Sequence, residues 1–354
     1  MKKRQLIVGL LVLVALVALF LWGREKFHFD FDVFRRQVAQ ADWHMIALGA
    51  GCIYVAYVFR ALRWALLLRP TKHIPPFSLL GTQVIGFTAV ALIGRVADPV
   101  RPYLVAKRTG LPISSQLAVY VVERLFDAGS MALIFSVSIL LTPASAFTHP
   151  EIVKRAGEWG MLLTVAGSLF LVAIRLAGGV VASFFEHTFG LVSKRLGAAI
   201  GDKIRTFRAG LDTMRTFGDF CRAAGLSIAM WFIIALAYLW TVRAFVASPE
   251  LASMSWARCM LLLALSGTVS ALQLPVIGWF TQIGFVAAAL TSFYGAAPEA
   301  ATACAATLLL ATFLCVVPVG LIWAQFEHVS LRKITHDSEH IAEDLPRTTT
   351  SVAE

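Results

Sequence analysis

One apolar stretch of the sequence, residues 115–141, contains the charged residues Glu123, Arg124 and Asp127. Each charge costs about 2.5–3.5 kcal/mol at the centre of a membrane helix, and about a dozen apolar side chains at roughly 0.5 kcal/mol each do not offset three of them. Glu123 and Asp127 share one helix face, whereas Arg124 is rotated from it by about 100°. We expect these residues to face a polar cavity inside a helical bundle. The alternative is an internal salt-bridge network that only holds helices together.

A second charged group consists of Arg60 and Arg63, which lie three residues apart beside Trp64 in another apolar stretch. Arg60 would lie roughly 13 Å from the helix end near Arg69, about the limit that a snorkelling side chain reaches. The sequence leaves two alternatives open. The pair either snorkels to the membrane interface or joins the polar cavity.

The third group interrupts the apolar pattern at residues 94–103, Gly-Arg-Val-Ala-Asp-Pro-Val-Arg-Pro-Tyr. Glycine permits a turn, each proline removes a backbone donor, and the short helix that follows begins with free N–H groups, which suits an anion. Arg95 and Arg101 flank that start, and the arginine fork pairs well with phosphate. If the three groups converge, five arginines against three acids give a net positive site. These residues are Arg60, Arg63, Arg95, Arg101 and Arg124, with Asp98, Glu123 and Asp127.

The elements that position these residues must be membrane helices. Of the 354 residues 58% are hydrophobic and only 15% are charged, and the mean hydropathy is +0.75. The apolar runs have about the length that spans a bilayer, and only helices and closed barrels satisfy their backbone groups in lipid. The sequence therefore predicts an all-α integral membrane protein, a polytopic bundle of about eight transmembrane helices.

The first predicted helix is an uncleaved anchor in residues 1–22, because the apolar run is followed by charged residues without a small-x-small cleavage pattern. Two shorter stretches, 95–106 and 276–294, are bounded by glycine and proline and are predicted to be broken or re-entrant elements. Their similar layout suggests an internal repeat with the substrate path between its two broken elements. The other long helices are predicted near 43–68, 76–93, 115–142, 159–177, 220–247, 256–273 and 299–325.

Lysine and arginine near helix ends favour the cytoplasmic side, which predicts cytoplasmic N- and C-termini in a multi-pass protein of the inner membrane. Residues 43–325 form the predicted transmembrane domain, 179–218 a cytoplasmic amphipathic connector, and 327–354 a polar tail. The connector is expected to lie on anionic headgroups or to dock on the bundle as a solvated segment. These cytoplasmic clusters account for the net charge of +10, so a nucleic-acid partner is not predicted.

Familiar enzyme motifs are missing from the sequence. It has no GxxxxGK[ST] phosphate loop, no HExxH and no GxSxG. The five cysteines stand singly in apolar stretches without metal-binding spacing. We therefore predict no catalytic residues, no cofactor and no metal site.

The charged motifs resemble those of the lysyl-phosphatidylglycerol synthase transmembrane family, which includes flippase-like modules. The family's usual pattern is Gly-Arg-x-Gly-Glu-x-x-Arg followed by a helix with Glu-Arg-x-x-Asp, and the resemblance covers about residues 40–330. Arg95 and Arg101 match the first part, and residues 123–127 match the second. Asp98 stands where a glutamate is common, and Arg63-Trp64 fits the Arg-Trp of the family's second helix. The specific motifs lie in the first half of the chain.

Three positions depart from that pattern: Ile93 replaces a proline, Pro99 is unexpected, and Gln282 stands where the second break often carries an acid. These departures predict that the second half has altered coupling or an altered substrate. No segment after the last predicted helix resembles an aminoacyl-transfer domain, so lipid lysylation is not expected.

The resemblance implies a lipid transporter or flippase, which is not an enzyme. We expect an anionic, phosphate-bearing lipid to cross through a cationic groove, with membrane lipids as partners and anionic headgroups at the cytoplasmic face. The five arginines are the predicted phosphate contacts, and Asp98, Glu123 and Asp127 are predicted counter-charges or proton carriers. The alternatives are an integral-membrane transferase or accessory subunit that holds a lipid-linked substrate, and a structural scaffold. The identity of the lipid, the energy source and the oligomeric state, including a homo-oligomer, stay open.

Overall fold

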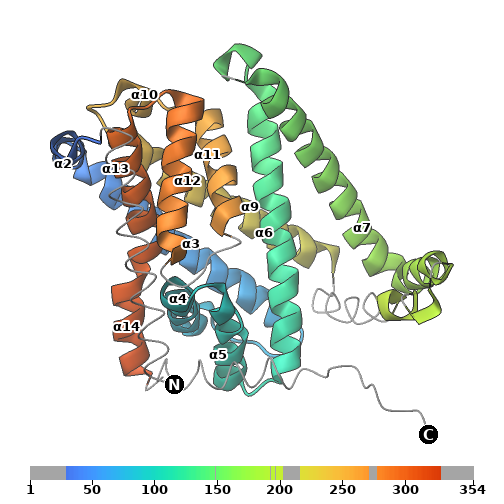
Figure 1. The fold of residues 1–354 in the computed structure, drawn as a ribbon. Helices are drawn as coiled ribbons and strands as arrows, with labels where there is room; N and C mark the ends of the chain where they lie inside the picture. The colour runs from blue at the N-terminus through green and yellow to red at the C-terminus, as the bar shows by residue number, and fades with distance from the viewer. Residues whose placement is uncertain are drawn as a thin grey trace, which may run out of the picture.

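The computed structural model describes residues 29–147, 149–191, 193–195, 197–201, 216–270 and 277–327, and every regular element in them is a helix (Figure 1). The prediction of an all-α polytopic bundle is confirmed. The helices are α2 (Phe31–Ala39), α3 (Trp43–Leu68), α4 (Pro76–Ile93), η1 (Arg95–Ala97), α5 (Val100–Thr109), α6 (Ile113–Leu141), η2 (Ala144–Ala146), α7 (Pro150–Gly190), α9 (Phe217–Arg243), α10 (Pro249–Ala252), α11 (Trp256–Ser270), α12 (Ile277–Tyr294), α13 (Pro298–Leu309), η3 (Leu310–Leu314) and α14 (Val316–Phe326).

Six helical stretches in the described residues are long and apolar enough to cross a membrane. They are α3, α4, α6, α9, α12 and the continuous run of α13, η3 and α14. The helix α11 is apolar but shorter, with 15 residues. The prediction of about eight spans also counted residues 1–22, which lie outside the described residues, together with 159–177 and 256–273.

The pair α3 and α9 forms the centre of the bundle, and α4, α6, α11 and the last helices pack around it (Figure 1). A core of buried aliphatic and aromatic side chains joins α9, α11, α12 and α13. A second core joins α3, α6 and the start of α9 around Trp64, which is only 1% exposed. These two cores hold α3, α6 and α9 in fixed register beside one another, which positions the charged residues in their middle turns.

The break predicted at residues 94–103 is present. The helix α4 ends at Ile93, and Gly94 follows with φ of 85°, a conformation that side-chain-bearing residues rarely adopt. The short η1 and then α5 reverse the chain back along α4. The second element predicted to be broken or re-entrant, residues 276–294, is instead a continuous helix of 18 residues, α12. Residues 271–276, which include Pro275, lie outside the described residues.

The break after α4 meets the second half of the chain in space. Arg95 in η1 donates hydrogen bonds to the carbonyl oxygen of Ser270 at 2.9 Å and to its hydroxyl at 3.0 Å. From α12, the indole of Trp279 donates to the carbonyl oxygen of Ala91 at 3.0 Å. The end of α4 therefore lies against the end of α11 and the start of α12, the interface at which the sequence placed the substrate path.

The helix α7 differs from the prediction, because it begins at Pro150 and continues to Gly190 instead of covering only residues 159–177. Ala177 has non-helical torsion angles, φ −132° and ψ 35°, so the predicted end is a kink. The helix continues beyond the kink because Ala182 is fully buried and Phe185 packs on the core formed by α3 and α6. The segment predicted as a connector from residue 179 is therefore helical at its start. The rest of the predicted connector, the anchor in residues 1–22 and the predicted tail at 327–354 lie largely outside the described residues.

Candidate functional site

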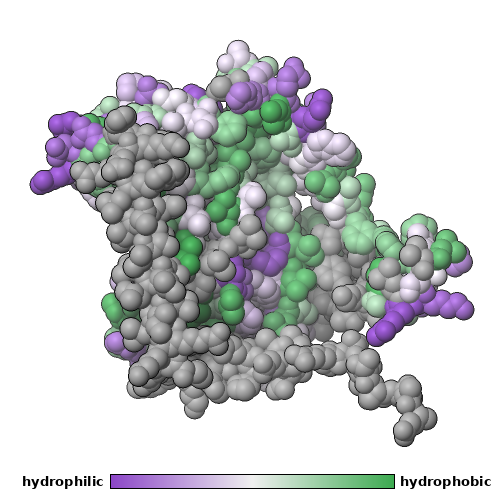
Figure 2. All heavy atoms as spheres, viewed as in Figure 1, coloured by the Kyte–Doolittle hydropathy of each residue, from purple (hydrophilic) through white to green (hydrophobic). Residues whose placement is uncertain are grey.

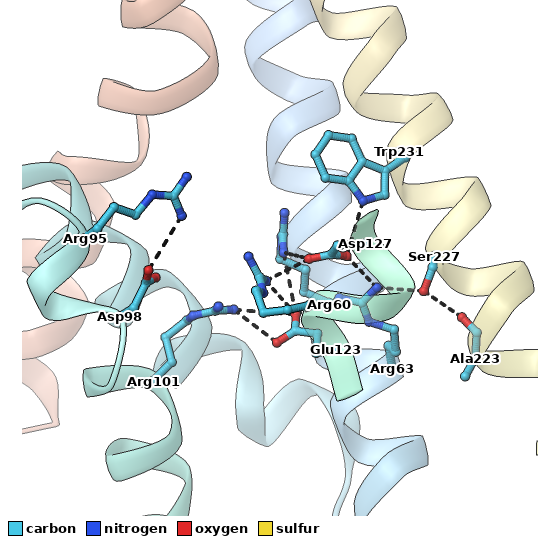
Figure 3. Close-up of polar contacts among 11 residues, drawn as sticks. Arg60, Arg63, Arg95, Asp98, Arg101, Glu123, Asp127, Ala223, Ser227 and Trp231 are labelled. Carbon is cyan, nitrogen blue, oxygen red and sulfur yellow. Dashed lines mark hydrogen bonds and ion pairs between the residues drawn. The ribbon is translucent and has the colours of Figure 1, made fainter. Parts of the chain in front are cut away.

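Two carboxylates at the middle of α6 form the centre of the site (Figure 3). Glu123 and Asp127 lie one helical turn apart and are only 1% and 4% exposed. Buried carboxylates are stable only with charged or hydrogen-bonding partners. Side chains from α3, α5, α6 and α9 supply these partners.

The arginines of α3 point at both carboxylates. Arg63 donates to Asp127 at 2.7 Å, to Glu123 at 2.7 Å and to the hydroxyl of Ser227 at 2.6 Å. Arg60 lies 3.5 Å from Glu123 and from Asp127. Both arginines are buried, so the structure excludes the snorkelling alternative and shows that they join the acids.

Arg101 reaches the same acids from α5, on the returning arm of the break. Its guanidinium lies 3.3 Å from Glu123 and covers the ring faces of Phe87 at 4.4 Å and Tyr120 at 4.9 Å. A Cβ atom on Gly86 would lie 2.1 Å from Cγ of Arg101, so only glycine lets this side chain pass α4. The fully buried Arg101 is therefore fixed by the hairpin geometry of α4 and α5.

Arg124 also contacts the acids, although its side chain leaves α6 on another face of the helix. Its guanidinium lies 2.8 Å from Asp127 and 3.4 Å from Glu123. The long side chain curls back along α6, and it stays 31% exposed. Arg124 is therefore the arginine of the cluster that is most open to its surroundings.

The pair Arg95 and Asp98 lies apart from this cluster, as Figure 3 shows. Their charged groups are 3.7 Å apart and their side chains are 34% and 20% exposed. The sequence grouped them with the other charges. The structure places them at the edge of the cluster, where Arg95 also donates hydrogen bonds to Ser270.

Two contacts from α9 were not predicted. Ser227 accepts from Arg63 and donates to the carbonyl oxygen of Ala223, and the indole of Trp231 donates to Asp127 at 3.2 Å. Serine and tryptophan inside an apolar helix are ordinary residues, and nothing in their spacing marks them as partners of distant charges.

The cluster is rich in positive charge. Four guanidinium groups face two carboxylates, which leaves an excess of two positive charges. Several buried guanidinium nitrogens, among them Nε and Nη2 of Arg101 and Nε of Arg124, have no hydrogen-bond acceptor among the described residues. A purely structural network gains most when charges and donors are matched. The imbalance instead fits a site that receives an anion.

A cavity of about 430 Å³ lies beside the cluster. Arg60, Arg124 and Asp127 line it from α3 and α6, and Arg95 lines it from η1. Arg63, Arg101 and Glu123 do not line it; they are buried behind the lining residues. Figure 2 shows a group of hydrophilic side chains in the middle of the view, between apolar side chains and near the position of α6 in Figure 1.

The rest of the lining comes from the second half of the chain. Tyr238 on α9, Ser266 and Ser270 on α11, and Gln282 on α12 face the same space.

Among the described residues, no group of three or more His, Cys, Asp or Glu is placed to hold a metal ion.

The chain matches one family model, described as the lysylphosphatidylglycerol synthase TM region, over residues 6–320. No curated protein matches the chain. The matched range contains every element that forms the cluster and the cavity.

Proposed function

The chain belongs to the family of the lysylphosphatidylglycerol synthase TM region, and from this premise we propose that it moves an anionic, phosphate-bearing lipid across or within the membrane. The observation that carries the proposal is the excess of two positive charges beside the cavity between the helices. A lipid phosphate in the cavity would supply the missing negative charge and an acceptor for Nε of Arg124, which lines the cavity.

A charged headgroup loses its hydration when it enters hydrocarbon, and the cost is prohibitive unless other groups replace the water. Guanidinium groups on the cavity wall can do so, because charge-assisted hydrogen bonds to phosphate are the strong ones. We assign the direct phosphate contacts to the three arginines that line the cavity, Arg60, Arg95 and Arg124.

The remaining charged residues of the cluster position the cavity-lining arginines. Arg63 and Arg101 lie behind the wall and hold Glu123 and Asp127 in place. The two acids in turn orient Arg60 and Arg124. We further propose that one of the acids carries a coupling proton, which transport measured with and without a pH gradient would test.

We also propose that the protein lies in the inner membrane in the predicted orientation. The end of the bundle at which α3 and α5 end is then cytoplasmic. At that end Lys72 donates to the carbonyl oxygen of Thr109, and Arg108 pairs with Glu327 at 2.5 Å. Arg69 and Arg222 flank a groove of about 680 Å³ at the same end of α3. Such a concentration of basic residues favours the cytoplasmic side and anionic headgroups.

The function is tested by reconstituting the protein in liposomes and measuring how fast a tail-labelled phosphatidylglycerol becomes accessible from the other leaflet. Arg124→Gln removes a cavity-lining guanidinium, and Arg258→Gln is the matched control, because Arg258 is partly exposed on α11 and covers Tyr294 outside the cavity. We expect wild type and the control to accelerate lipid movement. A lost charge-assisted hydrogen bond of about 1.5–3 kcal/mol corresponds to a reduction of roughly 10- to 150-fold for Arg124→Gln.

No acceleration by folded wild type with any anionic lipid would overturn the proposal. Formation of a new lipid product from a lipid-linked donor would support the transferase alternative instead. That alternative needs a free general base, whereas Asp127, the carboxylate that lines the cavity, already faces Arg60, Arg63, Arg124 and Trp231.

A further inference from the structure

The cavity has two walls of different chemistry. The wall from the first half of the chain carries the arginines. The wall from the second half is neutral and hydrogen-bonding: Tyr238 and Ser266 share a hydrogen bond at 3.0 Å, and the amide of Gln282 donates to Ser266 at 3.2 Å. Ser270 extends this wall to the rim, where it meets Arg95.

The neutral wall is also free of acids by sequence. Between residues 220 and 326 the chain has only two, Glu250 and Glu299. Glu250 accepts from Ser248 beside α10, and Glu299 accepts from the backbone of Asp30 at the start of α13. Neither residue lines the cavity. A cationic group that entered this space would meet no carboxylate on the second-half wall.

The wall from the first half of the chain does not supply a free carboxylate for a cationic group either. Asp127 is the acidic residue that lines the cavity, and it already faces three guanidinium groups and the indole of Trp231. A headgroup with a free ammonium would therefore add positive charge to a region that already has an excess of it. Like charges in a space of low dielectric repel strongly.

We propose, resting on the transport function proposed above, that the cargo has an anionic phosphate and a neutral, hydroxyl-bearing headgroup beyond it. The arginine wall binds the phosphate, and the wall of Tyr238, Ser266, Ser270 and Gln282 binds the hydroxyl groups. Aminoacylated lipids with cationic headgroups are transported more slowly. Gln282 is the residue that sets this preference, because it lines the same cavity as Arg60 and Arg124, and a carboxylate in place of its amide would accept an ammonium.

The test compares transport of three tail-labelled lipids in liposomes of neutral phospholipid: phosphatidylglycerol, phosphatidylethanolamine and lysyl-phosphatidylglycerol. For wild type we expect phosphatidylglycerol to move at least tenfold faster than the lysylated lipid, with the zwitterionic lipid between them. Gln282→Glu should reduce this ratio at least fivefold. Gln325→Glu is the matched control, since Gln325 is exposed near the end of α14, and it should leave the ratio unchanged.

A second variant, Ser270→Asp, covers the case in which Gln282→Glu does not fold, because it places a carboxylate on the same wall beside Arg95 and should also lower the ratio. If wild type moves the lysylated lipid as fast as phosphatidylglycerol, the inference about the headgroup is wrong while the transport function stands. If neither Gln282→Glu nor Ser270→Asp changes the ratio in folded protein, the neutral wall does not select the headgroup. If folded wild type moves none of the three lipids, the transport function itself is overturned, and the inference with it.

Discussion

Replacing Glu123 with glutamine removes the carboxylate that all four arginines of the cluster share. The arginine nitrogens lie 2.7 Å (Arg63), 3.3 Å (Arg101), 3.4 Å (Arg124) and 3.5 Å (Arg60) from its oxygens. Glutamine has nearly the same shape, so packing is preserved and the change is almost purely one of charge. The excess in the cluster rises from two positive charges to three.

The magnitude follows from burial. Removing one partner of a buried ion pair costs about 3–5 kcal/mol, and Glu123 faces more than one partner, so we expect the upper part of that range. Arg124→Gln changes the charge in the opposite direction, from an excess of two to one, and its side chain is 31% exposed. We expect it to lower the free energy of unfolding by about 1 kcal/mol or less.

The assay is the free energy of unfolding in bicelles at neutral pH, measured by steric trapping for wild type, Glu123→Gln and Arg124→Gln. The reasoning predicts that loss of the acid destabilises the protein more than loss of the arginine, by about 3 kcal/mol. Equal effects, or a larger effect of Arg124→Gln, would refute the claim that the cluster is positively charged in the folded protein.

Two further predictions concern side chains that position the cluster. Gly86→Ala places a Cβ atom 2.1 Å from Cγ of Arg101, and such overpacking should lower the free energy of unfolding by about 1–3 kcal/mol; an unchanged value would mean that Arg101 can leave the hairpin freely. Ser227→Ala removes the acceptor 2.6 Å from Arg63, and we expect a loss of about 1 kcal/mol in the same measurement; a stabilised protein would show that this contact is strained.

Much of the site could be predicted from residue spacing. Glu123 and Asp127 are one turn apart, so a helix must present them together. The Gly-Arg break indicated that α5 folds back, which brings Arg101 to the acids. The cost of charges in an apolar helix predicted that they face inward, and the structure shows a buried network.

The remainder depends on tertiary contacts that spacing does not encode. Arg124 was assigned to another face of its helix, and only the reach of its flexible side chain returns it to Asp127 at 2.8 Å. Trp231 contributes through the packing of α9 on α3 and α6.

The last helix was predicted as continuous, yet residues Leu310–Leu314 form a π-helical segment. Pro318 lies four residues after Leu314 and has no N–H to donate to the carbonyl oxygen of Leu314. The proline ring also clashes with that carbonyl group, which disfavours regular α-helix at this point. The hydroxyl of Tyr54 donates to the nearby carbonyl oxygen of Cys315 at 2.7 Å. The proline was visible in the sequence, but its effect depends on a partner from α3.

The central claim is that the cavity-lining arginines hold a lipid phosphate, and equilibrium binding tests it without reference to transport. The affinity of a short-chain, water-soluble phosphatidylglycerol is measured by calorimetry for purified wild type, Arg124→Gln and the control Arg258→Gln. We expect wild type and the control to bind equally, and Arg124→Gln to bind roughly 10- to 150-fold more weakly, as the loss of about 1.5–3 kcal/mol implies. Equal affinity for all three folded proteins would contradict the assignment of the phosphate to this cavity.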